Sequence, residues 1–185
     1  MSVLLISAQA VKDRSRIVEA VDADVLRPTI DTAQRVHLLP ILGAGLYDHL
    51  IANYSSLDSD HTTLLQTYIW PALVHFVVLE AVDDLTYRIE GGIVGMRQSD
   101  NLTNASESEI NRLRDRERQR AHSEAVRLIK HIRDNTSTFT TYGKKGAVSG
   151  NIYPASELDF QGNTLEYAVR SRKPLRRYLY DDPRS

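Results

Sequence analysis

The pattern of apolar and polar positions predicts a mainly α protein: a small bundle of four to five helices, one of them long, followed by an extended and largely irregular C-terminal arm. Apolar side chains recur at the three-to-four-residue spacing of a helix face through most of the first 140 residues. We divide the chain into a helical domain, residues 1–140, and an arm, residues 141–185.

Two helices are expected before residue 55. A weak amphipathic signal at residues 11–20 precedes a stronger one that begins at Asp22 or Asp24, either of which can cap a helix. Pro40 should end that helix. Gly43-Ala44-Gly45 should then form a flexible corner before a second helix at residues 46–54. This glycine pair is a helix-to-helix corner rather than a nucleotide-binding turn, because that turn must follow a β-strand.

The most apolar stretch, residues 68–82, is interpreted as a buried core helix. Asp60 is a suitable N-cap, Pro71 predicts a kink or break, and Gly91-Gly92 should lie just beyond the helix end. Residues 93–104 are expected to form a loop or a small hairpin. A membrane span would need about 20 predominantly apolar residues, and Glu80 interrupts this run. We therefore expect no membrane partner.

The longest helix should run from Ser106 to about Asp134, because Ser106 followed by Glu109 is a capping-box pattern. Its apolar stripe consists of Ile110, Leu113, Ala121, Ala125, Leu128 and Ile132. Residues 112–120 are charged nearly all round, and ion pairs three residues apart can stabilise them. This half of the helix could stand away from the core as a solvated face, or lie near DNA or a neighbouring subunit as a channel or inter-subunit face. The candidate residues for that face are Arg112, Arg116 and Arg120.

The last 50 residues show no sustained helical period, yet they hold 7 of the 13 aromatic side chains and a net charge of +3. Spaced aromatic residues and arginines are typical of interface anchors and rim contacts. The alternative is a flexible basic end; we favour an arm that docks onto another chain. The candidate interface residues are Phe139, Tyr142, Tyr153, Phe160, Tyr167, Arg170, Arg172, Lys173, Arg176, Arg177, Tyr178 and Tyr180.

Composition narrows the function further. The 185 residues carry 23 Lys and Arg against 24 Asp and Glu, a balance that argues against coating nucleic acid by bulk electrostatics. The absence of cysteine excludes disulfides, thiol chemistry and cysteine-ligated metals. The first ten residues have no basic region and only a short apolar run, so we expect no signal peptide and an intracellular, soluble protein.

No motif carries catalysis. There is no P-loop, no His-Glu-x-x-His pattern and no nucleophile elbow. His75 lies within the apolar helix, where it could face Glu80 or, with better reason, a backbone carbonyl. We expect no catalytic residues, no metal and no cofactor, and so no enzyme.

The stretch PTIDTAQRVHLLPILGAGLYDHL, residues 28–50, resembles a recurring signature of neck proteins of tailed bacteriophages, in which an Ala-Gln on one helix precedes a Leu-Gly-x-x-Leu-Tyr that opens the next. Two later features fit: GGIV at residues 91–94 with a Ser/Asn-rich loop after it, and IRDNTSTF at residues 132–139 closing the charged helix. The resemblance covers about residues 22–142.

This resemblance implies a head–tail connector, also called an adaptor or head-completion protein. Such proteins form rings, commonly of twelve copies, below the portal protein, and the genome passes through the ring. The implied partners are further copies of the chain, the portal protein, the next neck or tail protein, and double-stranded DNA that is not read by sequence. The implied location is the virion neck, after assembly in the host cytoplasm. Docking of the arm onto the portal is expected by analogy.

Two other functions remain open. A DNA-binding packaging accessory protein would use residues 112–120 and 170–177, and its DNA binding would depend steeply on salt. A helical enzyme has no motif in its favour.

Overall fold

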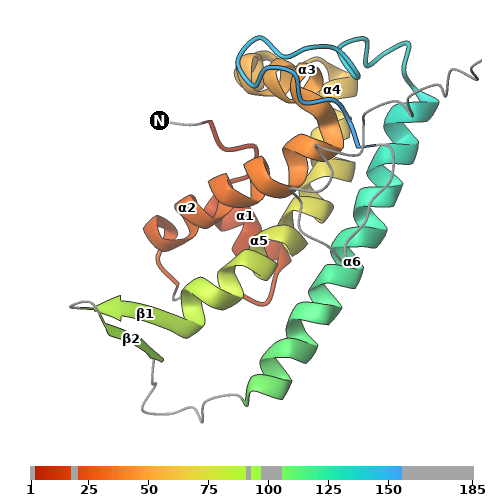
Figure 1. Cartoon of the computed structure of the whole chain (residues 1–185). Helices are drawn as coiled ribbons and strands as arrows, with labels where there is room; N and C mark the ends of the chain where they lie inside the picture. The colour runs from red at the N-terminus through yellow and green to blue at the C-terminus, as the bar shows by residue number, and fades with distance from the viewer. Residues whose placement is uncertain (1–2, 18–20, 91–92, 97–105, 156–185) are drawn as a thin grey trace, which may run out of the picture.

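The computed structural model describes residues 3–17, 21–90, 93–96 and 106–155. It confirms the mainly helical fold (Figure 1). The α-helices are α1 (Ala8–Arg14), α2 (Ala23–Ala33), α3 (Leu39–Ala52), α4 (Ser59–Thr63), α5 (Trp70–Thr86) and α6 (Glu107–Asp134). A short 3-10 turn, Tyr54–Ser56, follows α3.

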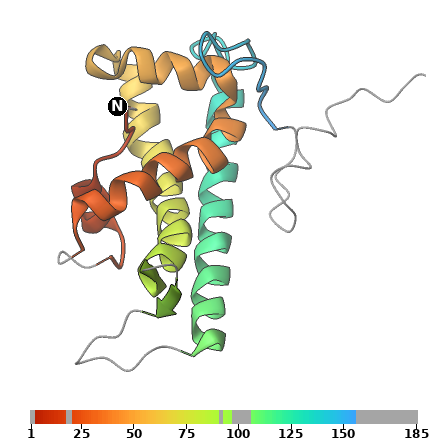
Figure 2. The ribbon, with the colours of Figure 1, turned by 60° about the vertical axis from the view of Figure 1, so that its left-hand side comes forward.

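Helices α5 and α6 form the centre of the fold. They run antiparallel and side by side, while α1 and α2 cover the other side of α5 and α3 crosses at one end (Figures 1 and 2). Apolar side chains from all these elements make one continuous core, in which Phe76, Leu42 and Leu128 are fully buried. Burial of side chains of this size contributes about 1.5–3 kcal/mol each, so the shared core holds the helices in place.

Two π-helical turns join helical segments at places where the sequence predicted an end or a break. One, Gln34–Leu38, joins α2 to α3, and the other, Leu64–Ile69, joins α4 to α5. Each ends just before a proline, Pro40 or Pro71. A proline ring clashes with the carbonyl four residues earlier, and a wider turn relieves that clash. The prediction that Pro40 ends its helix is therefore wrong: the chain stays helical through Pro40 and breaks at Gly43.

Side-chain caps set several helix starts. Asp22 caps α2 by accepting from the Asp24 N–H at 3.0 Å, as one of the two expected caps. Asp58, not Asp60, caps α4, and its carboxylate accepts from the His61 N–H at 2.8 Å. The capping box of Ser106 is present as predicted, and α6 ends at the expected Asp134.

Helix α5 ends earlier than the glycine pair suggested. It stops at Thr86, and Tyr87–Glu90 forms strand β1, which pairs antiparallel with strand β2, Ile93–Met96. Glu90 pairs with Ile93, so Gly91-Gly92 connects two strands instead of following a helix. The expected small hairpin thus exists but begins six residues before its predicted range, and residues 97–104 lie outside the described part.

One continuous helical stretch, Ser59–Val82, is long and apolar enough to cross a membrane by length and composition alone. More than half of its most apolar window, 56%, is buried inside the protein. Ala72, Leu73 and Val77 are fully buried. This packing is that of a core helix, as the sequence predicted.

Candidate interaction surfaces

Gly43 breaks α3 into two helical segments. Its φ of 71° lies in the left-handed region, which glycine adopts without strain. The break removes the helical partners of nearby backbone groups, among them the Ala44 N–H and the Pro40 carbonyl. The expected corner is therefore confirmed in position, and it leaves backbone groups that another segment must satisfy.

Residues 143–155, here called the strap, satisfy these groups. The Ala44 N–H donates to the Ile152 carbonyl at 2.7 Å, and the Gly45 N–H donates to the Lys144 carbonyl at 3.2 Å. In the other direction, the Ala155 N–H donates to the Pro40 carbonyl at 2.9 Å. The strap thus replaces hydrogen bonds that a continuous helix would have made.

Glycines allow the strap to lie directly on α3. A Cβ atom at Gly45 would lie 2.4 Å from the Thr141 carbonyl oxygen, and one at Gly146 would lie 2.5 Å from the Asp48 carboxylate and 2.6 Å from the Ala44 side chain. Contacts this short are impossible, so both positions need hydrogen in place of a side chain. The corner is tightly packed against residues 141–155, a contact that the sequence did not predict.

Asp48 fastens the strap. Its Oδ2 accepts from the Val148 N–H at 2.6 Å and the Ser149 N–H at 2.8 Å, and its Oδ1 accepts from the Ser149 hydroxyl at 2.5 Å. Partial burial acts to raise the pKa of Asp48, but these hydrogen bonds to the charged form outweigh it and hold the pKa below its ordinary value. The ionised carboxylate is therefore the form that holds the strap.

The signature region also anchors the N-terminal segment. Gln34 is fully buried, and its Oε1 accepts from the Leu5 N–H at 2.6 Å. Burial raises the pKa of Tyr47, and a side-chain hydrogen bond with Gln34 acts against that rise. The Trp70 indole N–H donates to the Leu5 carbonyl at 2.7 Å. The Ala-Gln and Leu-Tyr positions of the signature thus build one buried unit that joins three parts of the chain.

The strap carries exposed apolar side chains. Val148 is 90% exposed, Tyr153 57% and Ile152 39%. Backbone hydrogen bonds and the Asp48 carboxylate fix the segment that presents them. Three exposed apolar side chains on one short segment make the strap a candidate for contact with another chain.

Phe139 and Tyr142 do not share that exposure. Phe139 is 2% exposed and packs edge-on against His61, with ring centroids 5.4 Å apart, and near His131 at 5.8 Å. Tyr142 is half-buried against the same core. The prediction that Phe139 anchors an interface is wrong, because its ring already fills a socket of its own chain.

Residues 141–155, which the sequence assigned to the arm, instead pack on the helical body, mostly through the hydrogen bonds of the strap. The remaining candidate interface residues lie outside the described residues: Phe160, Tyr167, Arg170, Arg172, Lys173, Arg176, Arg177, Tyr178 and Tyr180.

Helix α6 contacts α5 through a hydrogen bond between a buried carboxylate and an imidazole. Glu117 is 2% exposed; its Oε2 lies 2.7 Å from His75 Nδ1, and its Oε1 accepts from an Arg120 guanidinium N–H at 2.9 Å. Neither partner expected for His75 is found. Glu80 instead pairs with His37 at 2.7 Å, and that hydrogen bond lowers the pKa of Glu80 against the opposing effect of burial.

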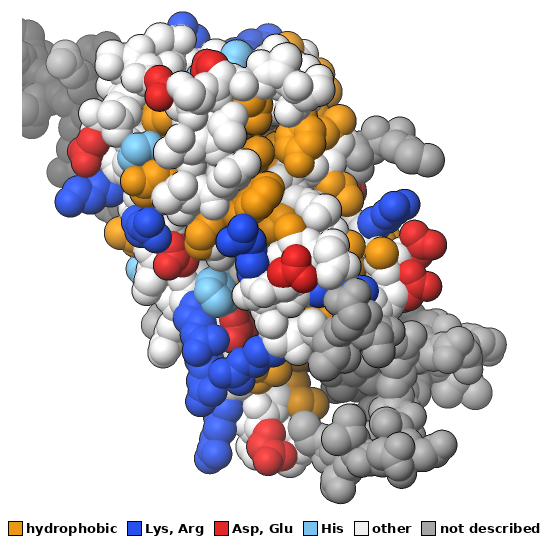
Figure 3. Space-filling view, turned by 180° about the vertical axis from the view of Figure 1, so that it is seen from behind, with side chains coloured by type: hydrophobic (Ala, Val, Ile, Leu, Met, Phe, Trp, Pro, Cys, Tyr) orange, Lys and Arg blue, Asp and Glu red, His pale blue; other side chains and the backbone are white. Residues whose placement is uncertain are grey.

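The outer surface of α6 carries the other predicted face. Arg112, Arg116 and Arg120 are exposed, as are Arg127 and Lys130 further along the helix. We call these five residues the basic stripe. In the view from behind, Lys and Arg side chains form a column along the edge of the molecule where α6 lies (Figure 3). The sequence identified the first three members and missed Arg127 and Lys130.

Among the side chains that the structure describes, no three His, Asp or Glu residues are placed to hold a metal ion. The two candidate surfaces of the described chain are therefore the strap and the basic stripe.

Comparison with known proteins gives a family and no function. Residues 38–152 match DUF6712, a family of unknown function, and the chain belongs to this family. No curated protein and no solved structure matches it. The matched range begins just before the α3 corner and ends within the strap, so it contains both parts that meet there.

Proposed function

We propose that this member of the DUF6712 family is a structural virion protein: a ring-forming head–tail connector that docks below a portal protein and surrounds the DNA channel. The observation that carries the proposal is the strap, because hydrogen bonds to α3 fix this segment while Val148 and Tyr153 stay exposed. A ring subunit needs such preformed contacts with its neighbours.

Two further features support this function. The core is an all-helical body of the kind that the neck-protein resemblance implies. Residues 156–185 contain four aromatic residues and a run of cations, which suits an arm that docks onto the portal or onto an adjacent subunit.

The proposed partners follow from this role. They are further copies of the chain in a ring, with twelve as the expected number, the portal protein, the next neck or tail protein, and double-stranded DNA that passes without sequence recognition. The proposed location is the virion neck, after assembly in the host cytoplasm.

Native mass spectrometry and electron microscopy of the full-length chain, alone and with its portal protein, test the proposal. We expect closed rings of one stoichiometry. Substituting Val148→Asp together with Tyr153→Asp should reduce ring formation at least tenfold, because each introduces a charge into an apolar contact. Val126→Asp, at a valine that is 48% exposed on α6, is the matched control outside the strap.

The structure also sharpens the test of the arm. A deletion should begin after Ala155, because a cut at residue 143 would also remove the strap from α3. We expect the chain without residues 156–185 to keep its helical content and to lose docking onto the portal. Docking that survives this deletion would overturn the role of the arm.

The alternative, a DNA-binding packaging accessory protein, has the basic stripe in its favour. It predicts a chain that stays monomeric with and without portal and binds duplex DNA with a steep salt dependence.

A further inference from the structure

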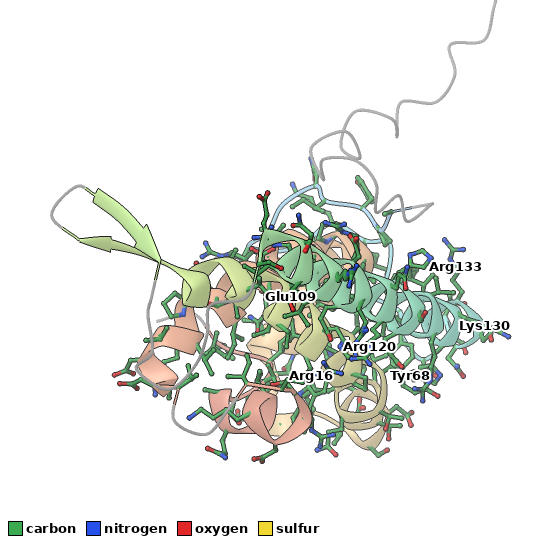
Figure 4. The ribbon with its side chains drawn as sticks, turned by 90° about the horizontal axis from the view of Figure 1, so that it is seen from below. Arg16, Tyr68, Glu109, Arg120, Lys130 and Arg133 are labelled. Atoms are coloured by element: carbon green, nitrogen blue, oxygen red, sulfur yellow. The ribbon has the colours of Figure 1, made fainter. Side chains whose placement is uncertain are left out.

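The basic stripe occupies one narrow sector of α6. At about 100° per residue, Arg112, Arg116, Arg120, Arg127 and Lys130 lie within about 80° of one another around the helix axis. They extend over about 27 Å at about 1.5 Å per residue. Figure 4 labels Arg120 and Lys130 along the helix, with Glu109 near its start.

The acidic residues of this part of α6 lie off the stripe. Between Arg112 and Lys130 they are Asp115, Glu117 and Glu124. Glu117 is buried toward α5, and Asp115 pairs with Arg118, outside the stripe, at 3.1 Å. The sequence alone suggested that acidic residues cancel the field of these arginines, but the helix separates the two signs onto different faces.

Two members of the stripe are held in place by the body. Arg120 is bound by the buried Glu117 at 2.9 Å. Arg127 is bound by Glu124 at 3.2 Å, and its guanidinium lies 5.0 Å from the centroid of the Tyr68 ring. Both side chains remain about half exposed, so each presents a fixed positive group to solvent at little further cost in conformational entropy.

The other three members face solvent more freely. No ion pair in the described part of the chain involves Arg116 or Lys130, and Arg112 has only a Coulombic interaction with Glu109. Even with Glu109, Glu117 and Glu124 counted against it, the stripe keeps two positive charges in excess. It has no apolar centre, since Ser123 lies between Arg120 and Arg127. Protein interfaces need a desolvated apolar core, so this surface fits a polyanion better than a second protein.

We propose that the basic stripe contacts the phosphate backbone of double-stranded DNA, which makes α6 the helix that faces the channel; this rests on the proposed ring. A duplex carries about one charge per 1.7 Å and repeats about every 34 Å, so a straight stripe of about 27 Å matches most of one turn. Phosphate contacts position DNA without reading its sequence. A small excess of charge binds weakly and allows the duplex to slide.

Binding of a fluorescent duplex of random sequence to the full-length protein, followed by anisotropy over a range of salt concentrations, tests this contact. We expect weak binding at about 50 mM salt, with a slope of log K against log salt of about −2 to −4, as two to four phosphates are neutralised per subunit. The triple variant R112E/R116E/K130E should bind at least tenfold more weakly. It leaves Arg120 and Arg127 in place, because they support Glu117 and Glu124.

The control is R27E/R35E, which reverses the charge at two exposed positions outside α6 and outside the strap. It should retain at least a third of the wild-type affinity. The neutral variant R112Q/R116Q/K130Q should show an intermediate loss, which separates loss of contact from misfolding. Equal loss in the stripe and control variants, or no binding by the wild-type protein, would overturn the contact.

Ring formation by the same variants separates this inference from the proposed function. Stripe variants that form normal rings but lose DNA support both. Stripe variants that fail to form rings would show that the stripe binds a second subunit. That result would overturn the DNA contact, but it would leave the proposed ring-forming function standing. A wild-type chain that binds DNA through the stripe without forming rings would overturn the connector function instead.

Discussion

The α3 corner and the basic stripe are both built on a helix, but the corner is covered by another segment of the chain and the stripe faces solvent. At the corner, a broken helix is closed by its own chain: the strap supplies backbone hydrogen bonds, and glycines let it approach to contact distance. On α6, an unbroken helix keeps one charged sector open to solvent. The comparison teaches that the hydrogen bonds and close contacts of the corner stabilise the fold, whereas the charges of the stripe remain available for the proposed contact with DNA, and each claim can be tested by substitution.

Among substitutions near the corner, Phe139→Ala should have the largest effect on stability. The ring is 2% exposed in a socket near His61 and His131, so its removal leaves a cavity that should lower the free energy of unfolding by about 3–5 kcal/mol. Chemical denaturation measures this. Tyr153→Ala, at a ring that is 57% exposed, is the control and should change stability by less than about 1 kcal/mol.

Gly45→Ala should have the next largest effect on stability. Alanine in a helix is normally more favourable than glycine by about 1 kcal/mol, so a stabilised protein would show that the strap is not held against this position. We expect the opposite sign, a loss of about 1–3 kcal/mol, because the new Cβ atom would lie 2.4 Å from the Thr141 carbonyl oxygen. Thermal denaturation gives the sign directly.

Asp48→Asn should release the strap at a cost of about 1–2 kcal/mol, since the amide cannot replace a carboxylate that accepts three hydrogen bonds. Amide exchange of Val148 and Ser149 reports the release. Asp60→Asn, at an exposed carboxylate, is the control and should leave that exchange unchanged.

The hydrogen bonds between Asp48 and the strap should depend on pH. The pKa of Asp48 is lowered in the folded protein, so its contribution is complete above the ordinary aspartate pKa of about 4 and is lost as the pH falls through the lower, folded value. The amide signals of Val148 and Ser149 should therefore shift only below about pH 4. A transition near neutral pH would point to a different group.

The smallest effect is expected on the stripe. R112Q/R116Q/K130Q should change the free energy of unfolding by less than about 0.5 kcal/mol, because exposed surface charges contribute little to folding. A loss of several kcal/mol in denaturation would show that the stripe stabilises the body and would remove the contrast with the corner.

Periodicity and capping residues predicted the helical class, the start of α2 and both ends of α6, because these features depend on local sequence. Pro40 misled, because the chain stays helical through it after a π-helical turn, whereas before Pro71 a π-helical turn interrupts the regular helix close to the predicted kink or break. The strap was missed because its hydrogen bonds join residues about 100 positions apart. Asp48 directly follows the Leu-Tyr of the signature, and Gly146 and Gly150 are the only sequence signals that could have suggested its partner.

The charged sites were predicted in part. The sequence placed Arg112, Arg116 and Arg120 on a charged helix, but only the packing of α6 on α5 shows that Glu117 turns inward with His75. Charge counted along the chain cannot show that separation, whereas charge counted by helix face can.

Cryo-electron microscopy of the assembled full-length protein tests the central claim most directly. The account predicts a closed ring in which α6 of every subunit lines the central channel and the five residues of the basic stripe point into it. A protein that remains monomeric with its portal, or a ring whose α6 helices lie on the outer wall or between subunits, would contradict it.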